Sequence, residues 1–182
     1  MGVIMPRITI SGHPGSGTST LVSKLSEKYQ WTTINGGQVF RDEASRRGLS
    51  LSDFAKLCSK DEAVDRELDN TLKTIIQENV IDIVESRLAG WWAYRLDSKC
   101  IRLWLQVSDE ERANRVSSRE NITFDLAFKE NYERTNRDSK RYMKMYGIDP
   151  EQPEPYTHVV DATEIGTDEV FSRVVEILEA SN

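Results

Sequence analysis

The feature that most limits the fold of this chain is a glycine-rich segment, Gly12–Thr20, with the sequence GHPGSGTST. It directly follows Arg7–Ser11, whose alternating β-branched residues predict a strand. It directly precedes Leu21, Val22 and Leu25, which fall at helical spacing. A glycine-rich turn between a strand and a helix lets main-chain N–H groups converge on an anion. We therefore predict that nine consecutive residues bind nucleotide phosphates, rather than forming only a tight turn: Gly12, His13, Pro14, Gly15, Ser16, Gly17, Thr18, Ser19 and Thr20.

One position of this loop departs from the usual pattern G-x-x-x-x-G-K-[ST], because Thr18 stands where that pattern has lysine. The lysine bridges the β- and γ-phosphates as a point charge, whereas a hydroxyl donates one hydrogen bond and cannot neutralise a phosphate. Either another cation reaches the loop, or the loop binds a phosphate without transferring it. Ser19 occupies the hydroxyl position that would ligate Mg²⁺.

The rest of the chain alternates predicted strands with predicted helices. Further strands are expected at Trp31–Ile34, Val80–Val84, Ile101–Val107 and His158–Asp161. Helices are expected at Val39–Arg47, at a short segment through Phe54 capped by Ser50 or Ser52, at Asp61–Glu78, from a cap at Asp109 to Arg119, from a cap at Thr123 to about Tyr146, and at Asp168–Ala180. Strands that alternate with helices form a parallel sheet covered on both faces, so the fold class is α/β with a five-stranded parallel sheet.

The composition fits one domain. The chain has 182 residues, with 24 Lys and Arg against 30 Asp and Glu, and its net charge of −6 argues against general binding to nucleic acid or to a membrane surface. No apolar run approaches the roughly 20 residues of a membrane span, and the start of the chain, MGVIMPRITI, lacks a signal-peptide layout. Cys58 and Cys100 lie in unrelated segments, which indicates reduced thiols and a cytoplasmic location.

These motifs resemble those of archaeal cytidylate kinases, a family of P-loop nucleoside monophosphate (NMP) kinases. The loop GHPGSGTST resembles their GPPGSGTTT-type loop, in which threonine at the lysine position is customary. Further matching segments follow in family order over nearly the whole chain: Gly36–Arg41, Asp61–Asp69, Glu85–Trp91, Asn136–Tyr142 and Tyr146–Asp149. The chain departs from the family pattern at His13, Gln38 and Ser86, and Ser86 adds a side chain beside the reaction centre, where glycine is usual.

The resemblance implies a phosphotransferase of pyrimidine nucleotide metabolism that uses ATP and Mg²⁺ to convert CMP, and also dCMP, to the diphosphate. It implies the NMP-kinase fold in a single domain, residues 1–182, with an NMP-binding helical insertion at about 36–79 and a small lid at about 112–137. A monomer that acts on small molecules is expected.

Two other functions stay open. A different acceptor, such as AMP, UMP or a shikimate-like molecule, would keep the reaction, and Thr18 keeps open a nucleotide-binding regulator with little turnover. An RNA-binding module built on the Arg112–Arg141 cluster is disfavoured by the net charge and by the lack of an RNA motif.

Polar residues that follow two predicted strands are candidates for the acceptor and metal sites. Arg41 follows the second strand, and a bidentate guanidinium suits the acceptor phosphate. Glu85 and Arg87 follow Val80–Val84, and ligands of open parallel sheets bind beyond the carboxyl ends of strands. We expect Glu85 to hold Mg²⁺ through water and Arg87 to clamp the acceptor phosphate. The alternatives are a solvated Arg41 and a structural ion pair between Glu85 and Arg87.

Arginines recur at steps of three and four on two neighbouring predicted helices, and therefore share one face of each: Arg112, Arg115 and Arg119 on the first, and Arg134, Arg137 and Arg141 on the second. Two such faces joined by a short connector predict a lid hairpin over the donor phosphates; the alternative is two solvated helix faces. A lid arginine that stabilises transition-state charge is worth about 10³–10⁵ in rate, enough to offset a missing loop lysine. We expect the catalytic charge from four residues, with Lys140 as a second-rank candidate: Arg87, Arg115, Arg119 and Arg137.

Asp138 completes the predicted acceptor site, which also contains Arg41, Arg87 and the neighbouring Arg137. Its carboxylate would accept a hydrogen bond from the exocyclic amine of cytosine, whereas uracil would present a carbonyl there and leave both groups unpaired. A cap or an ion pair is an equal alternative for Asp138. The acidic stretch Asp61–Asp69 either helps to form the acceptor pocket or is a charged surface, and the aromatic residues near Trp91 are expected to pack.

Overall fold

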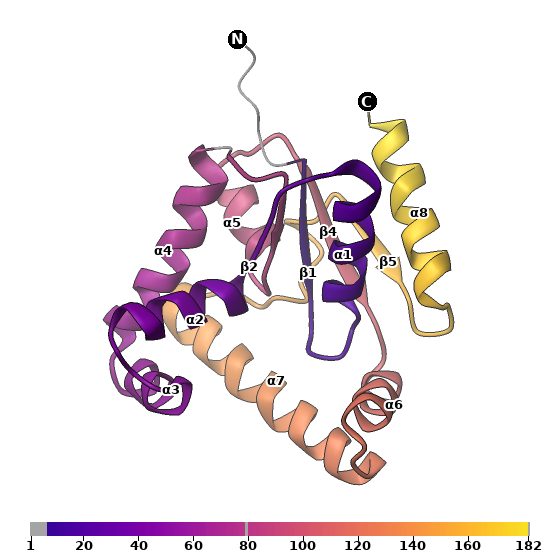
Figure 1. Ribbon diagram of the computed structural model, residues 1–182. Coiled ribbons are helices and arrows are strands. Elements are labelled where there is room, and N and C mark those ends of the chain that lie inside the picture. The colour runs from indigo at the N-terminus through magenta and orange to yellow at the C-terminus, as the bar shows by residue number, and fades with distance from the viewer. Residues whose placement is uncertain (1–6, 79, 182) are drawn as a thin grey trace.

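The computed structural model describes residues 7–78 and 80–181. Residues 1–6, 79 and 182 lie outside these ranges. They include the segment without a signal-peptide layout, both ends of the predicted domain and the last residue of the predicted insertion. Five parallel strands form one sheet in the order β2-β3-β1-β4-β5 (Figure 1), which confirms the predicted sheet. The strands are β1 (Ile8–Gly12), β2 (Thr33–Asn35), β3 (Ile83–Glu85), β4 (Ile101–Gln106) and β5 (His158–Asp161).

One strand begins and ends later than its apolar run predicts. Val80 is 64% exposed, and the Asp82 carboxylate accepts hydrogen bonds from Thr32 and Arg7 at the sheet edge. Pairing with β1 and β2 therefore starts at Ile83 and continues to Glu85, which lies opposite Ile10 of β1.

Eight helices accompany the strands in the described part of the chain: α1 (Thr18–Tyr29), α2 (Gly36–Arg46), α3 (Leu51–Lys60), α4 (Glu62–Glu78), α5 (Ala89–Arg95), α6 (Asp109–Glu120), α7 (Phe124–Tyr146) and α8 (Thr167–Ala180). Helix α5 is not predicted from the sequence. It has only seven residues, and its aromatic run AGWWAYR shows no helical alternation because nearly every position is buried. None of the helices in residues 7–78 and 80–181 is both long and apolar enough to cross a membrane.

The helix caps follow the predictions except at α6. Ser50 caps α3 and Thr123 caps α7, each with a side-chain oxygen that accepts from the N–H three residues later. At α6 the cap is Ser108, which accepts from the N–H of Glu111, so the prediction of Asp109 as the cap is wrong. The backbone turns helical at Asp109, whose carboxylate pairs with Arg112 instead.

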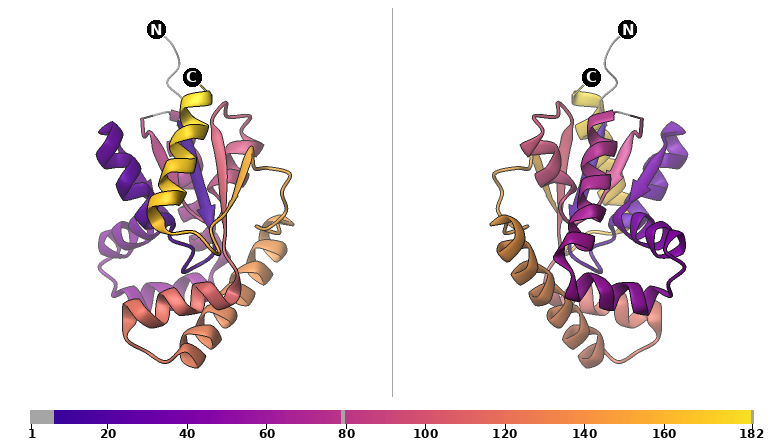
Figure 2. Two further views of the ribbon diagram at one scale, coloured as in Figure 1. Left: turned by 90° about the vertical axis from the view of Figure 1, so that its right-hand side faces the viewer. Right: turned by 90° about the vertical axis from the view of Figure 1, so that its left-hand side faces the viewer.

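One face of the sheet is covered by α1 and α8. Leu21 and Leu25 of α1 and Val174 of α8 pack on a buried cluster that includes Ile8 and Leu103 of the strands. Figure 2 shows α8 at the front of one side view and α4 at the front of the opposite one. The predicted covering of both faces is therefore confirmed.

The other face is covered by α4, α5 and the last turns of α7. Trp92 of α5 is buried against the sheet cluster and meets the Tyr146 ring edge-to-face, with ring centroids 4.9 Å apart. The Lys73 ammonium lies 4.1 Å from the centroid of the Trp92 ring. Trp91 and Trp92 are both buried, which confirms the expected packing, whereas their neighbour Tyr94 is 38% exposed.

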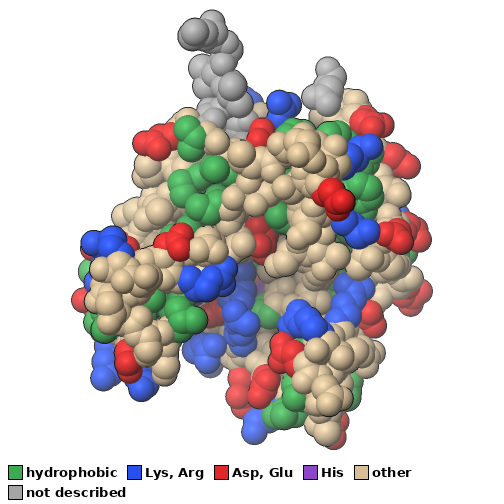
Figure 3. All heavy atoms as spheres, in the orientation of Figure 1, with side chains coloured by type: hydrophobic (Ala, Val, Ile, Leu, Met, Phe, Trp, Pro, Cys, Tyr) green, Lys and Arg blue, Asp and Glu red, His purple; other side chains and the backbone are tan. Residues whose placement is uncertain are grey.

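Two groups of helices extend beyond the carboxyl edge of the sheet: α2–α4 on one side and the α6–α7 hairpin on the other (Figure 1). The phosphate-loop segment between β1 and α1 lies at this edge. Figure 3 shows a hollow between α2 and α6 in which Lys and Arg side chains gather, although the chain as a whole is acidic. The fold thus brings the loop and the basic side chains to one place.

Candidate active site

The backbone of the glycine-rich loop is the first element of the site. Gly15 and Gly17 have φ of 84° and 90°, the left-handed region that favours glycine. A Cβ on Gly15 would also lie 2.9 Å from the carbonyl oxygen of Arg112. Helix α1 starts directly after Gly17, which makes no side-chain cap, so the first N–H groups of the helix face the loop without a side-chain acceptor. This is the geometry of an anion site at a helix N-terminus.

Thr18 and Glu85 connect the loop to strand β3. The Thr18 hydroxyl donates to Glu85 Oε1 at 2.8 Å. Burial raises the pKa of Glu85, while the hydrogen bond from Thr18 and the charge of Arg87 oppose that rise. The residue in the lysine position therefore binds an acid of the sheet.

The predicted metal ligands, Ser19 and Glu85, offer suitable donors for Mg²⁺. Within the described ranges, neither the Ser19 hydroxyl nor Glu85 Oε2 makes a hydrogen bond, so both are available to a cation or its waters. Hydroxyl and carboxylate oxygens are the hard ligands that Mg²⁺ takes. Residues 7–78 and 80–181 contain no group of three or more His, Cys, Asp or Glu arranged to hold a metal.

Two arginines of α6 are attached to the loop. Arg112 is 2% exposed and donates to the carbonyl of Pro14 at 3.1 Å and to Asp109 at 2.5 Å. Arg115 donates to the carbonyl of Ser16 at 3.1 Å, and also to Ala162 and Glu111. These two guanidinium groups line the back of the loop, which brings positive charge to it.

The third arginine of this face is different. Arg119 is exposed and pairs only with its neighbour Glu120, at 2.8 Å, among the described residues. It lies one turn further along α6 than Arg115, towards the connector to α7. The structure thus brings Arg115 to the loop and does not bring Arg119 there.

Arg87 meets α7 in a buried ion-pair network. Arg87 pairs with Asp138, which also lies 3.7 Å from Arg141, and Arg141 pairs with Asp65 of α4 at 3.3 Å. Burial lowers the pKa of Arg87 to about 10, which still leaves it charged at neutral pH. Of the two alternatives for Asp138, the structure has the ion pair, and no Glu85–Arg87 pair forms among the described residues.

The remaining predicted arginines have free guanidinium groups or weak partners. In the described part of the chain, the side chains of Arg134 and Arg137 form no ion pair or hydrogen bond. Arg41 is exposed and donates to Gln38 Oε1 at 3.0 Å. Guanidinium groups without an ion-pair partner are suited to bind an added anion.

The face of α7 around Asp138 is broader than the predicted set. Arg134, Asp138 and Arg141 are spaced by four and three residues and therefore share one face, and Arg134 and Arg141 both act electrostatically on Arg87. The arginine spacing identifies this face from the sequence, but of its three arginines only Arg137 belongs to the predicted site. Asp138, which lies at helical spacing from Arg134 and Arg141, is the sequence feature that could have identified the whole face.

The acidic helix α4 is bound to the end of α7. Asp69 accepts from the Tyr146 hydroxyl at 2.5 Å, Glu62 pairs with Lys144, and Arg66 donates to the carbonyl of Met145 at 3.3 Å. Burial raises the pKa of Asp69, whereas the hydrogen bond from Tyr146 opposes that rise. Much of the acidic stretch is therefore a helix–helix contact, and its part in an acceptor pocket remains a prediction.

His13 is a loop residue whose side chain turns inward. The ring is 8% exposed, its Nε2 lies 2.6 Å from Glu151 Oε1, and it meets Trp104 edge-to-face. Burial lowers the pKa of His13, and the hydrogen bond with Glu151 opposes this. His13 therefore contributes its main chain to the loop and its ring to the packing behind it.

Glu151 is held in place by a neighbouring contact. The Tyr156 hydroxyl donates to the carbonyl of Pro150 at 2.6 Å. A Cβ on Gly90 would lie 2.5 Å from the Tyr156 ring, and the Gly90 N–H donates to the Ser11 hydroxyl at 3.2 Å.

Ser86 lies close to the backbone of Gly36, because a Cβ on Gly36 would lie 3.2 Å from the Ser86 Cβ. Glycines at these positions allow the elements around the loop to pack together.

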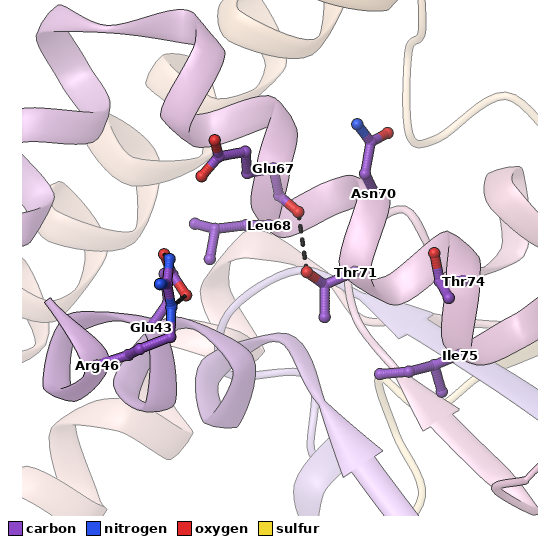
Figure 4. A pocket seen from close by; sticks show the side chains of 8 residues that line it. All are labelled: Glu43, Arg46, Glu67, Leu68, Asn70, Thr71, Thr74 and Ile75. Carbon is purple, nitrogen blue, oxygen red and sulfur yellow. Dashed lines mark hydrogen bonds and ion pairs between the residues drawn. The ribbon is translucent and has the colours of Figure 1, made fainter.

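A groove of about 500 Å³ lies between α2 and α4, away from the loop (Figure 4). Its polar lining includes the hydrogen bond from the Thr71 hydroxyl to the carbonyl of Glu67. None of the predicted site residues lines it; the lining residues are Glu43, Arg46, Glu67, Leu68, Asn70, Thr71, Thr74 and Ile75. The groove is therefore separate from the phosphate site.

Comparison with known proteins identifies the family. A protein-family model described as an AAA domain matches residues 8–144. The cytidylate kinase of Methanocorpusculum labreanum is 38% identical over 168 residues, which are 92% of this chain and 93% of that protein. The cytidylate kinase of Pyrococcus furiosus is also 38% identical over 168 residues, 92% of this chain and 85% of that protein. The chain belongs to the cytidylate kinase family and to the AAA-domain family.

The solved structures agree with this cytidylate kinase assignment at the level of fold. Shikimate kinase from Bacteroides thetaiotaomicron has a TM-score of 0.60 at 14% identity, and the match covers 95% of this chain and 98% of that one. At such low identity the likeness shows the fold alone. The predicted resemblance to archaeal cytidylate kinases and the predicted kinase fold are both confirmed.

Proposed function

We propose that the protein transfers the γ-phosphoryl group of ATP to CMP, giving CDP and ADP. The observation that carries the proposal is the match to proteins named cytidylate kinase over 92% of the chain. The loop geometry, the basic hollow and the hydroxyl at position 18 are consistent with it. The protein acts as a cytoplasmic monomer on small molecules, without nucleic acid or membrane.

The loop residues Gly12–Thr20 bind the donor phosphates through main-chain N–H groups. Ser19 and Glu85 would hold Mg²⁺, with Glu85 acting through water, and the ion would neutralise phosphate charge. Arg115 supports the loop from behind, since its guanidinium bonds the Ser16 carbonyl. Phosphoryl transfer needs positioning and charge neutralisation more than covalent help, and this set supplies both.

The acceptor monophosphate lies between the helical insertion at about 36–79 and the lid at about 112–137. Arg41 and Arg87 bind its phosphate, and Arg137 adds positive charge from the lid. Arg119 reaches the donor phosphates only when the lid closes, since its present partner is Glu120. Closure also excludes water, which prevents hydrolysis of ATP.

Asp138 reads the cytosine amine of CMP or dCMP. Its ion pairs with Arg87 and Arg141 favour the ionised carboxylate, which accepts hydrogen bonds only. A uracil carbonyl at this point leaves two acceptors unpaired, and the expected penalty is about 1–3 kcal/mol.

The test is an ADP-release assay with purified protein, ATP, Mg²⁺ and each nucleoside monophosphate in turn. Turnover restricted to CMP and dCMP supports the proposal. Equal turnover with AMP or UMP assigns another acceptor. ATP binding without turnover on any acceptor contradicts it and favours a nucleotide-binding regulator.

A further inference from the structure

The side chain of Thr18 is held on two sides. Its hydroxyl donates to Glu85 Oε1 at 2.8 Å. Its methyl carbon lies 3.0 Å from the position that a Cβ on Gly12 would occupy, so the methyl group packs over the Gly12 backbone. A β-branched side chain has few χ1 rotamers, and these two contacts select one of them.

This arrangement excludes one simple role for Thr18. A hydroxyl has a single proton to donate, and the proton of Thr18 is used by Glu85. The side chain therefore does not replace the absent lysine by donating to a phosphate. Its contact is with the acid that lies at the carboxyl end of β3.

Glu85 depends on this contact. Among residues 7–78 and 80–181, Thr18 is the only donor of a hydrogen bond to the Glu85 carboxylate. The nearby guanidinium of Arg87 pairs with Asp138 instead. A half-buried carboxylate with one donor is oriented by that donor, and its second oxygen, Oε2, stays available.

We infer that Thr18 is a positioning residue for Glu85, and that it holds Oε1 so that Oε2 binds a water of Mg²⁺-bound nucleotide. The inference rests on the proposed use of ATP and Mg²⁺. Loss of a group that orients a metal ligand or its water costs about 10–100-fold in metal affinity. Threonine at this position thus acts on the metal through the acid rather than on the phosphate directly.

The test compares Thr18→Val, which keeps the shape and removes the hydroxyl, with Thr18→Ser, which keeps the hydroxyl and removes the methyl group. Calorimetric titration measures the Kd of ADP in MgCl₂ and again in EDTA. In Thr18→Val we expect the gain in affinity from Mg²⁺ to fall about tenfold or more, with the Mg²⁺-free Kd within about threefold of wild type. Thr18→Ser should recover most of the gain.

Thr9→Val is the matched control, because Thr9 is a fully buried threonine of β1 whose hydroxyl has no partner among the described residues. It should leave both Kd values unchanged. An equal loss with and without Mg²⁺ in Thr18→Val would mean that Thr18 acts on the phosphates, and an unchanged gain would mean that it positions nothing. Either result overturns the inference, as does failure of Thr18→Ser to recover the gain.

A double mutant keeps the inference testable if Thr18→Val folds poorly. If Thr18 acts through Glu85, adding Thr18→Ala, which also removes the hydroxyl, to Glu85→Gln should change the Mg²⁺ gain less than twofold; independent effects of the two substitutions overturn the inference. These titrations contain no acceptor. A protein that phosphorylates AMP instead of CMP would refute the proposed function and leave this result intact.

Discussion

The arginine faces of α6 and α7 look alike in sequence but differ in the structure. On α6, the guanidinium groups of Arg112 and Arg115 donate to carbonyls of the phosphate loop and also pair with acids of their own helix. On α7, Arg134 and Arg137 make no side-chain ion pair within residues 7–78 and 80–181. Two arginines of the α6 face therefore build the site, and two of the α7 face are available to a ligand.

Local acids do not explain this difference. Arg115 pairs with Glu111, four residues earlier, as helical spacing predicts. Arg134 and Arg137 have glutamates at the same spacing but no such pair forms. The distinguishing factor is the tertiary partner, since only α6 lies against the loop. The spacing of arginines in the sequence predicts that a helix has a charged face. The tertiary contacts of that face determine whether its arginines bind protein groups or stay available to a ligand.

The largest effect is expected at Arg87, which follows β3 and pairs with Asp138 of α7. Arg87→Ala should lower kcat/KM by about 10³-fold or more, because the acceptor phosphate loses its charged partner. The circular dichroism spectrum should stay unchanged, since Asp138 keeps Arg141 nearby. Arg173→Ala, which breaks an exposed pair on α8, is the control. Near-normal turnover in Arg87→Ala would refute the phosphate clamp.

Arg112 tests the structural face. Arg112→Ala should lower the free energy of unfolding by about 2–3 kcal/mol, because it removes buried packing and leaves the Pro14 carbonyl without its donor. Urea denaturation measures the change, and ADP affinity should weaken with it. Arg112→Met, which restores the aliphatic packing, should recover part of the stability. A variant as stable as wild type would show that the two faces do not differ in this way.

Arg137 gives the opposite signature on α7. Arg137→Ala should reduce kcat about 10²-fold with an unfolding free energy within about 0.5 kcal/mol of wild type, since the side chain has no partner to lose among the residues that the structure describes. Steady-state kinetics and urea denaturation on the same sample separate the two effects. Loss of stability without loss of kcat would reverse the comparison.

The smallest effect is expected at Arg119. Arg119→Ala should reduce kcat about tenfold through lost lid charge, and the unfolding free energy should hardly change because the pair with Glu120 is exposed. Stopped-flow or steady-state ADP release measures it. Unchanged kinetics would remove Arg119 from the lid.

Much of the fold follows from local patterns. The alternation of apolar and polar residues predicts the strands, and the capping residues Ser50 and Thr123 predict two helix starts. These patterns can be read from the sequence because they span only three or four residues. Asp109 was wrong as a cap because Ser108 beside it is an equally good one. Helix α5 was missed because burial on all sides leaves no periodicity to read.

The site was predictable only in part. The loop and its neighbours Glu85 and Arg87 could be located from the order of strand, turn and helix. The bond from Thr18 to Glu85 spans 67 residues, and the pair of Arg87 with Asp138 joins a strand end to a distant helix. Such contacts depend on how the elements pack, and no local pattern carries them.

The close approach of Gly90 to the Tyr156 ring has a consequence for sequence variation. A methyl group at position 90 would push the ring outward, and Pro150 would follow because its carbonyl accepts from the Tyr156 hydroxyl. Glu151 is the next residue, and it holds His13 of the loop. A side chain at position 90 would thus disturb the phosphate loop through Tyr156, Glu151 and His13.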